Sequence, residues 1–154
     1  MTTETFKSRL LRCLVNITPV FRATGAWVTY IDADIRLVKL ELPLKLKTRN
    51  PMGTLCGGNM YSAVHGVYST MLMKNIGQEY VCIDRLATIK FLKPAKSTLF
   101  TQFEITQEEI DETRILVEQN GKTDRQYLVK LKDKDGVVCC EVTSTINVHK
   151  IHTI

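Results

Sequence analysis

The sequence lacks the features that would direct this chain into a membrane or an oxidising compartment. No apolar run approaches the roughly 20 residues that a membrane-spanning helix needs. Residues 1–15 contain Glu4 and have neither an uninterrupted apolar segment nor a small-residue cleavage site, so they do not resemble a signal peptide. The five cysteines show no C-x-x-C spacing. We therefore expect a cytoplasmic protein with reduced thiols and no membrane partner.

The sequence also lacks metal-ligand spacings and nucleic-acid-binding motifs. The chain has only 3 histidines, and its cysteines lack metal-ligand spacing, so we expect no structural metal and no cofactor. The net charge is +5, but basic and acidic residues are interleaved without a long Lys/Arg block. This argues against a nucleic-acid partner. The charge is compatible with a phosphate-bearing small ligand, which needs only a few cations.

What the chain does contain is typical of one globular domain. It has 154 residues, of which 44% are hydrophobic and 24% charged. We found no repeat, low-complexity tract or linker in the sequence. The sequence therefore predicts a single domain over residues 1–154.

The spacing of apolar residues predicts two helices and a set of strands. Helical periodicity covers about residues 3–16 and about 58–74. Alternation with period two predicts strands at 27–31, 37–42, 81–91, 99–105, 115–119, 127–131 and 138–148. The acidic residues at 108–112 are expected to form a solvated loop. This order indicates α+β architecture, with an antiparallel sheet wrapped around one long central helix and an additional N-terminal helix. Edge strands of such a sheet favour pairing with a second subunit.

The segment from Asn50 to Gly58, N-P-M-G-T-L-C-G-G, comes directly before the central helix. Glycine permits close approach of another molecule to the backbone. A helix N-terminus supplies unpaired N–H groups and the positive end of a dipole. Such a segment can hold a carbonyl oxygen, with the Gly58 N–H as the donor that polarises it. A plain turn that starts a helix is the alternative interpretation.

This segment resembles the motif of hotdog-fold acyl-CoA thioesterases of the phenylacetyl-CoA type, Asn-x-x-Gly-x-x-His-Gly-Gly. Asn50, Gly53, Gly57 and Gly58 match that motif. Residues 89–95, I-K-F-L-K-P-A, are similar to the family's Phe-Leu-x-Pro-Ala segment. The resemblance, which extends over residues 25–148, implies a hotdog fold and a ligand related to acyl-CoA.

The chain departs from the family at the residues that carry the chemistry. Cys56 stands where the motif has histidine, and His65 stands where the helix has its catalytic carboxylate. No Asp or Glu lies between Gly57 and Lys74. The chain therefore resembles a divergent branch of unknown function that lacks the helix carboxylate.

Each candidate residue has a functional and a structural interpretation. His65 is a candidate general base, because neutral imidazole can activate water near neutral pH, or it is a hydrogen-bonded helix residue. Cys56 is a candidate nucleophile or a small buried residue in the substrate site. Asn50 either positions substrate or water, or bonds its own loop. The remaining substrate-binding candidates are Gly57, Tyr61, Tyr68, Lys90, Lys93 and Lys96. The three lysines fit either coenzyme A phosphates or a solvated strand edge.

These features together predict an acyl-CoA thioesterase that hydrolyses its substrate at a subunit interface of a homodimer or dimer of dimers. The proposed catalytic residues are Asn50, Gly58 and His65. Coenzyme A would enter as part of the substrate. The alternative is a hotdog protein that binds acyl-CoA without catalysis, since the helix carboxylate is missing.

Overall fold

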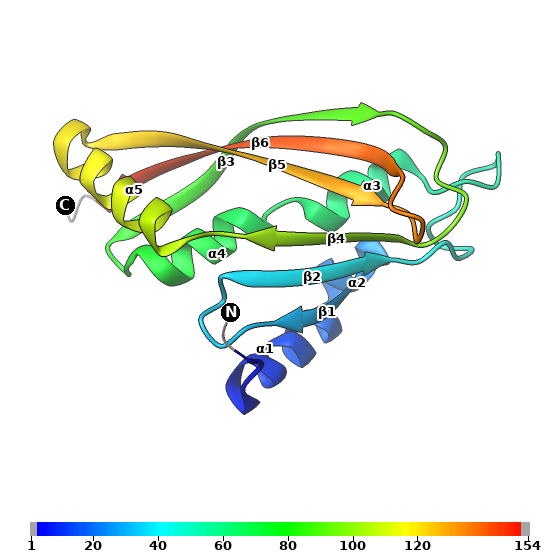
Figure 1. Cartoon of the computed structure of the whole chain (residues 1–154), viewed down its shortest axis with the longest axis horizontal. Coiled ribbons are helices and arrows are strands. Elements are labelled where there is room, and N and C mark those ends of the chain that lie inside the picture. Colours follow the sequence, from blue (N-terminus) through cyan, green and yellow to red (C-terminus); the bar gives the residue numbers. More distant parts are fainter. Residues whose placement is uncertain (1–2, 152–154) are drawn as a thin grey trace.

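The computed structural model describes residues 3–151. Its helices are α1 (Phe6–Ile17), α2 (Pro19–Thr24), α3 (Gly57–Val64), α4 (Val67–Ile76) and α5 (Gln107–Asn120). Its strands are β1 (Trp27–Ile31), β2 (Leu37–Leu42), β3 (Tyr80–Phe91), β4 (Leu99–Glu104), β5 (Lys122–Lys132) and β6 (Val138–Lys150). Figure 1 shows the sheet curving around α3 and α4. The predicted α+β architecture is thus confirmed.

All six strands form one antiparallel sheet in the order β1-β2-β4-β5-β6-β3. β6 pairs along most of its length with β5 on one side and β3 on the other. Between β4 and β5, by contrast, the described pairing is limited to Phe100 with Lys132. The sheet therefore consists of two well-paired groups of strands with a narrow connection between them (Figure 1).

The central helical segment is interrupted once. His65 ends α3 with extended backbone angles, φ −61° and ψ 135°, and Gly66 precedes α4 with φ 78°. Positive φ is costly for a residue with a Cβ atom, so the glycine permits this local break. The sequence predicted one helix over residues 58–74, and the break moves His65 from a helix face to a helix end.

Residues 107–120 form a helix, so the predicted strand at 115–119 is wrong. Thr106 and Glu109 make a reciprocal capping box that starts α5. Ile110, Thr113 and Val117 are buried at helical spacing against the rest of the protein. The acidic residues 108–112 lie in the first half of this helix, and the predicted acidic loop is also wrong.

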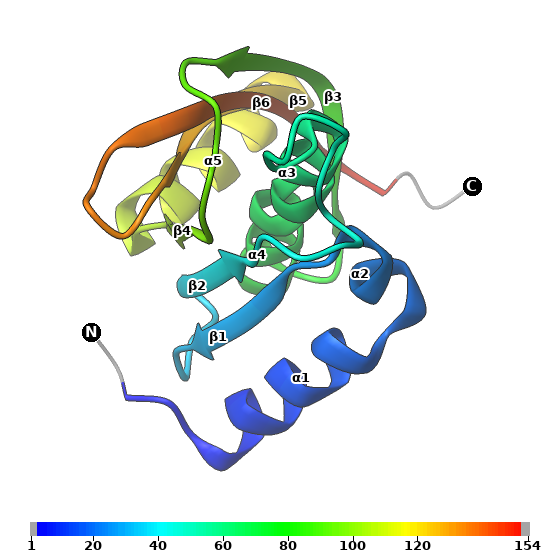
Figure 2. The same ribbon diagram turned by 90° about the vertical axis from the view of Figure 1, so that its right-hand side faces the viewer.

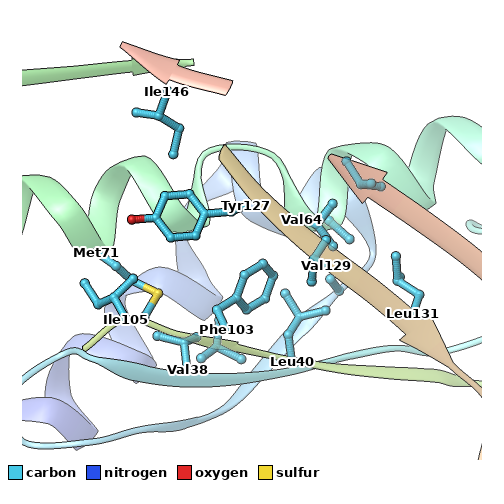
Figure 3. Close-up of a cluster of buried hydrophobic side chains, with 14 of the residues drawn as sticks. Val38, Leu40, Val64, Met71, Phe103, Ile105, Tyr127, Val129, Leu131 and Ile146 are labelled. Carbon is cyan, nitrogen blue, oxygen red and sulfur yellow. The ribbon is translucent and has the colours of Figure 1, made fainter. Parts of the chain in front are cut away.

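The core lies between the concave face of the sheet and the central helices (Figure 3). Side chains from sheet and helices meet there, and Phe103 of β4 is fully buried. Labelled in Figure 3 are Val38, Leu40, Val64, Met71, Phe103, Ile105, Tyr127, Val129, Leu131 and Ile146. Burial of this apolar surface supplies the main favourable contribution to folding. Within residues 3–151, no helix is long and apolar enough to cross a bilayer.

α1 covers the β1 edge of the sheet. The helix begins at Phe6 because Thr5 and Ser8 form a capping box. Figure 2 shows α1 outside β1, on the side away from α4. The Asn16 amide nitrogen donates to the Val28 carbonyl and its oxygen accepts from the Val28 N–H, both at 2.9 Å. Asn16 therefore supplies the two hydrogen bonds that a neighbouring strand would give.

Replacing Asn16 with alanine is expected to destabilise the fold by about 2–3 kcal/mol, because two hydrogen bonds are lost at a buried position. Asn16 is 8% exposed and Val28 5% exposed, so water cannot readily replace the amide. The urea midpoint should fall with little change in the m-value. Cys13→Ala, at an exposed position of the same helix, is the control and should have little effect. Equal midpoints for the two variants would contradict the edge-covering role of Asn16.

Candidate functional site

The N-terminus of α3 carries N–H groups that are available to a ligand. Cys56 is the N-cap residue, with φ −69° and ψ 132°, and its side chain makes no capping hydrogen bond. The first N–H groups of a helix have no acceptor within the helix. A Cβ atom at Gly58 would have only Cys56 Sγ within 4 Å, at 3.9 Å, among the described atoms. The space beside Gly58 is therefore open.

Asn50 organises the loop before this helix. Its side-chain oxygen accepts from the N–H groups of Met52, at 3.0 Å, and Thr54, at 3.2 Å. Its side-chain nitrogen donates to Thr54 Oγ1 at 2.9 Å. Gly53, with φ 81°, completes the tight turn. The structure thus gives Asn50 the loop-bonding role that the sequence left as one of two interpretations.

The two sequence segments that resemble the thioesterase family lie side by side. The Leu55 N–H donates to the Ala95 carbonyl at 2.9 Å, and both residues line a groove of about 700 Å³. We refer to this as the loop–strand groove. Its lining comprises Asn50, Met52, Thr54, Leu55, Gly57, Met60 and residues 91–96. Most of these lining residues are apolar, and the lining includes the cations Lys93 and Lys96.

Gly57 leaves room for a close aromatic contact. A Cβ atom at this position would come within 2.7 Å of Phe91 Cζ, so the half-exposed ring would have to shift. The lack of a side chain at residue 57 thus lets the ring lie close over the start of α3. Lys90, the third lysine predicted to contact a ligand, is exposed on β3 and is not among the residues that line the groove.

His65 lies in a second groove, which we call the helix groove. It has a volume of about 530 Å³ and runs between α2 and α3, with Tyr61 and Ser62 also in its lining. The Tyr61 hydroxyl oxygen is 3.2 Å from His65 Nδ1, and the two ring centroids are 5.3 Å apart. Since Nδ1 is occupied by this hydrogen bond, Nε2 is the ring nitrogen that faces other partners.

Tyr68 does not join His65. Its ring stacks on Tyr127 with centroids 4.2 Å apart and meets Phe103 edge-on at 5.2 Å. Burial raises the pKa of the Tyr68 hydroxyl, and it raises the pKa of Tyr127 to about 12. Tyr68 therefore packs with core residues, although the sequence suggested that it flanks the site.

The cysteines differ in their capacity for nucleophilic chemistry. Burial raises the pKa of both Cys82 and Cys140 to about 11, so almost none of either thiol is ionised at neutral pH. Cys56 is partly exposed at the N-cap, and its own N–H donates to the Thr48 carbonyl at 2.8 Å. Cys56 lines neither groove. Its position next to Gly58 leaves it beside the available N–H groups.

Asp84 is a carboxylate that the sequence did not single out. It lies on β3 and accepts a hydrogen bond of 2.7 Å from Ser69 Oγ of α4. Ser69 Oγ also lies 3.1 Å from the carbonyl oxygen of Gly66, at the helix break. An acidic group thus contacts the central helices from a strand, although the helices contain no acid themselves. Only the tertiary pairing of β3 with α4 reveals this contact.

One chain does not bring all the candidate residues together. Asn50, Gly57 and the two lysines line the loop–strand groove, whereas Tyr61 and His65 line the helix groove. Gly58 is exposed beside the loop–strand groove and lines neither. α3 contributes residues to both grooves. Within one chain, His65 and the N-terminus of α3 therefore belong to different grooves.

Solved structures with the same architecture define the class of fold. A Pseudomonas aeruginosa protein described as of unknown function and a probable thioesterase superposes with a TM-score of 0.83 at 18% identity, covering 98% of this chain and 100% of that chain. A Haemophilus influenzae thioesterase gives a TM-score of 0.69 at 13% identity, covering 99% and 96%. A Chlorobaculum tepidum protein of unknown function gives 0.71 at 15% identity, covering 94% and 95%. The chain has the hotdog fold, as the sequence resemblance predicted.

The family model that matches the chain is DUF4442, a domain of unknown function, over residues 7–148. The chain therefore belongs to the DUF4442 family, which agrees with the predicted branch of unknown function. The sequence matches none of the curated proteins.

Proposed function

We propose that this protein hydrolyses an acyl-CoA-like thioester bound in the loop–strand groove. The observation that carries the proposal is the open, uncapped start of α3 beside a groove that combines a mostly apolar lining with Lys93 and Lys96. The apolar lining suits an acyl group, and the cations suit the phosphates of a carrier. The thioesterases among the solved structures of this fold support the same reaction class.

In the proposed reaction, the Gly58 N–H donates to the thioester carbonyl oxygen and stabilises the negative charge that develops there. His65 Nε2 takes a proton from water, and the resulting hydroxide attacks the carbonyl carbon. The tetrahedral intermediate then expels the thiolate, which receives the proton from His65. The products are a carboxylic acid and a free thiol. Asn50 supports the reaction by fixing the loop that leads to Gly58.

The proposal places the site between two copies of the chain. α1 covers the β1 edge, but no described strand pairs with the outer side of β3, the opposite edge. Ile83 and Leu86 of β3 are 52% and 62% exposed. Pairing of two β3 edges would bury these side chains and bring the central helices of the copies near each other. His65 of one copy would then act on a thioester held at Gly58 of the other.

A protein that binds acyl-CoA without hydrolysing it is the second candidate. The observations that favour it are the lack of a carboxylate on α3 and α4 and the commitment of the Asn50 side chain to its own loop. Such a protein would use the same groove and the same lysines. The two candidates differ only in turnover.

The test is a panel of acetyl-, hexanoyl-, palmitoyl- and phenylacetyl-CoA, assayed for loss of thioester absorbance and for thermal stabilisation. Hydrolysis of at least one substrate is expected. Thermal stabilisation by an acyl-CoA without turnover would contradict hydrolysis and support the binding function. Neither turnover nor stabilisation with any substrate would contradict both candidates.

The double variant Lys93→Gln/Lys96→Gln is expected to raise KM for an active acyl-CoA by about tenfold, because two charge-assisted contacts to phosphate are lost. The value of kcat should change little. An N-acetylcysteamine thioester of the same acyl group lacks these phosphates, so its KM should be unaffected. Lys122→Gln, on β5, serves as the control for loss of surface charge. An unchanged KM in the double variant would argue against the phosphate role.

A further inference from the structure

α1 exposes four large apolar side chains, although Leu11 and Val15 pack against the core and the polar Ser8 and Asn16 are buried. Ser8 and Asn16 are 3% and 8% exposed, because they cap the helix and pair with β1. The outward side chains that are at least half exposed are Phe6, Leu10, Leu14 and Ile17. A surface helix normally turns its apolar residues toward the core and polar residues toward solvent, so a second apolar side that faces solvent is unusual. We call these four residues the α1 strip.

Cations border the α1 strip on both sides. At about 100° per residue, the four apolar side chains fall within an arc of about 80°. Lys7 lies just beyond one side of this arc and Arg9 lies on the other side. Residues 5–31 contain four Lys or Arg and no Asp or Glu. Glu4 is only 18% exposed at its side chain and pairs with Arg12 at 2.8 Å and with Arg9 at 3.8 Å. Glu41 of β2 lines the groove that also contains Trp27.

The chain's only tryptophan lies beside the α1 strip. Trp27 begins β1, is 45% exposed, and shares a groove of about 420 Å³ with Cys13 and Ile17 of α1. Val20 of α2, three residues after the end of α1, is also exposed, at 80%. Tryptophan favours the boundary between water and hydrocarbon, because its ring is apolar and its N–H is polar.

We propose that the α1 strip docks the protein on an anionic lipid surface. The apolar side chains enter the boundary between headgroups and acyl chains, and Lys7, Arg9 and Arg22 contact lipid phosphates. This contact is peripheral, so it needs no membrane-spanning helix. It departs from our expectation of no membrane partner, which rested on the lack of long apolar runs. The inference is independent of the proposed hydrolysis.

The charges favour lipid over a second copy of the same face. In a two-fold contact between two α1 helices, the cationic borders of each strip have no acidic residue within 5–31 of the other copy to pair with. Unpaired like charges at an interface oppose association. An anionic bilayer supplies the opposite charge along the whole strip.

Co-sedimentation of the full chain with phosphatidylcholine vesicles that contain about 30% phosphatidylserine tests the proposal. The wild type should sediment with these vesicles and show a blue shift of Trp27 emission. Binding should weaken in high salt and with phosphatidylcholine alone. The double variant Leu10→Asp/Leu14→Asp should lose about tenfold or more of the binding, because it removes apolar contact and adds negative charge.

Ile115→Asp is the matched control, because Ile115 is 56% exposed on α5, away from the strip. It should bind vesicles like the wild type. Lys7→Gln/Arg9→Gln provides a second test, because it keeps the apolar residues and changes only exposed side chains, so the fold should be retained. This variant should weaken vesicle binding several-fold. Failure of the wild type to bind anionic vesicles would overturn the proposal. Equal losses of vesicle binding in Ile115→Asp and in Leu10→Asp/Leu14→Asp would also overturn it. So would an oligomer that forms without lipid and that Leu10→Asp/Leu14→Asp alone dissociates.

Discussion

Gly58→Pro is expected to lower kcat for thioester hydrolysis by about 100-fold or more, because proline has no N–H to stabilise the developing oxyanion. Residue 58 lies in the first turn of α3, where the N–H has no acceptor within the helix. Proline is tolerated in that turn, so the helix should still form. The variant thus removes the proposed catalytic donor with little effect on the fold.

Gly58→Ala is the matched control for this substitution. It keeps the N–H, and its Cβ atom would meet only Cys56 Sγ at 3.9 Å, an ordinary contact distance. The alanine variant should therefore retain most of the activity. Thermal midpoints should be close to that of the wild type for both variants. Equal kcat values for the proline and alanine variants, at matched stability, would rule out the Gly58 N–H as the donor.

His65→Ala should also lower kcat by about 100-fold or more, since general base catalysis contributes at this level. For Nε2 to act as the base, Nδ1 must carry the proton and donate it to the Tyr61 oxygen, 3.2 Å away. Tyr61→Phe removes that acceptor and should reduce kcat by a smaller factor, about tenfold. His65 is exposed, and Tyr61→Phe keeps the ring that packs against the core, so the stability of both variants should be nearly unchanged.

His149→Ala is the control for His65→Ala. His149 lies on β6, bonds Asn147 through Nδ1 and lines neither groove, so its loss should leave kcat unchanged. Mixing His65→Ala with Gly58→Pro subunits adds a test of the shared site. If catalysis requires both residues from different copies, the mixed dimer should regain one functional site. If the subunits exchange and activity does not recover, either both residues act within one chain or one of them takes no part in catalysis.

The sequence predicted those elements whose apolar period was unambiguous. The alternation along residues 81–91 and 138–148 corresponds to β3 and β6, which pair over most of their length. The strand predicted at 115–119 is wrong because the apolar run Ile115-Leu116-Val117 is too short to distinguish a strand from a helix. Ile115 is 56% exposed, and the buried residues Ile110, Thr113 and Val117 follow helical spacing instead. The Thr106–Glu109 capping box was the local signal that marks this helix.

The site was predictable to the extent that it depends on backbone and local contacts. The Asn50 turn and the helix start at Gly57 follow from residues close in the sequence. The separation of His65 from that helix start could not be predicted, because it depends on the break at Gly66 and on the packing of α2 against α3. The Ser69–Asp84 contact likewise joins residues that only the folded chain brings together.

The narrow connection between β4 and β5 has a consequence for how the molecule fluctuates. A sheet normally resists local opening because each strand is held by a ladder of hydrogen bonds on both sides. Here the described ladder between the two groups of strands is reduced to Phe100 and Lys132. Side-chain packing in the core must therefore hold the β1-β2-β4 group to the β5-β6-β3 group. Amide hydrogens along the facing edges of β4 and β5 would then exchange with solvent through local openings that cost less free energy than global unfolding. The amide hydrogens of β6 would exchange last.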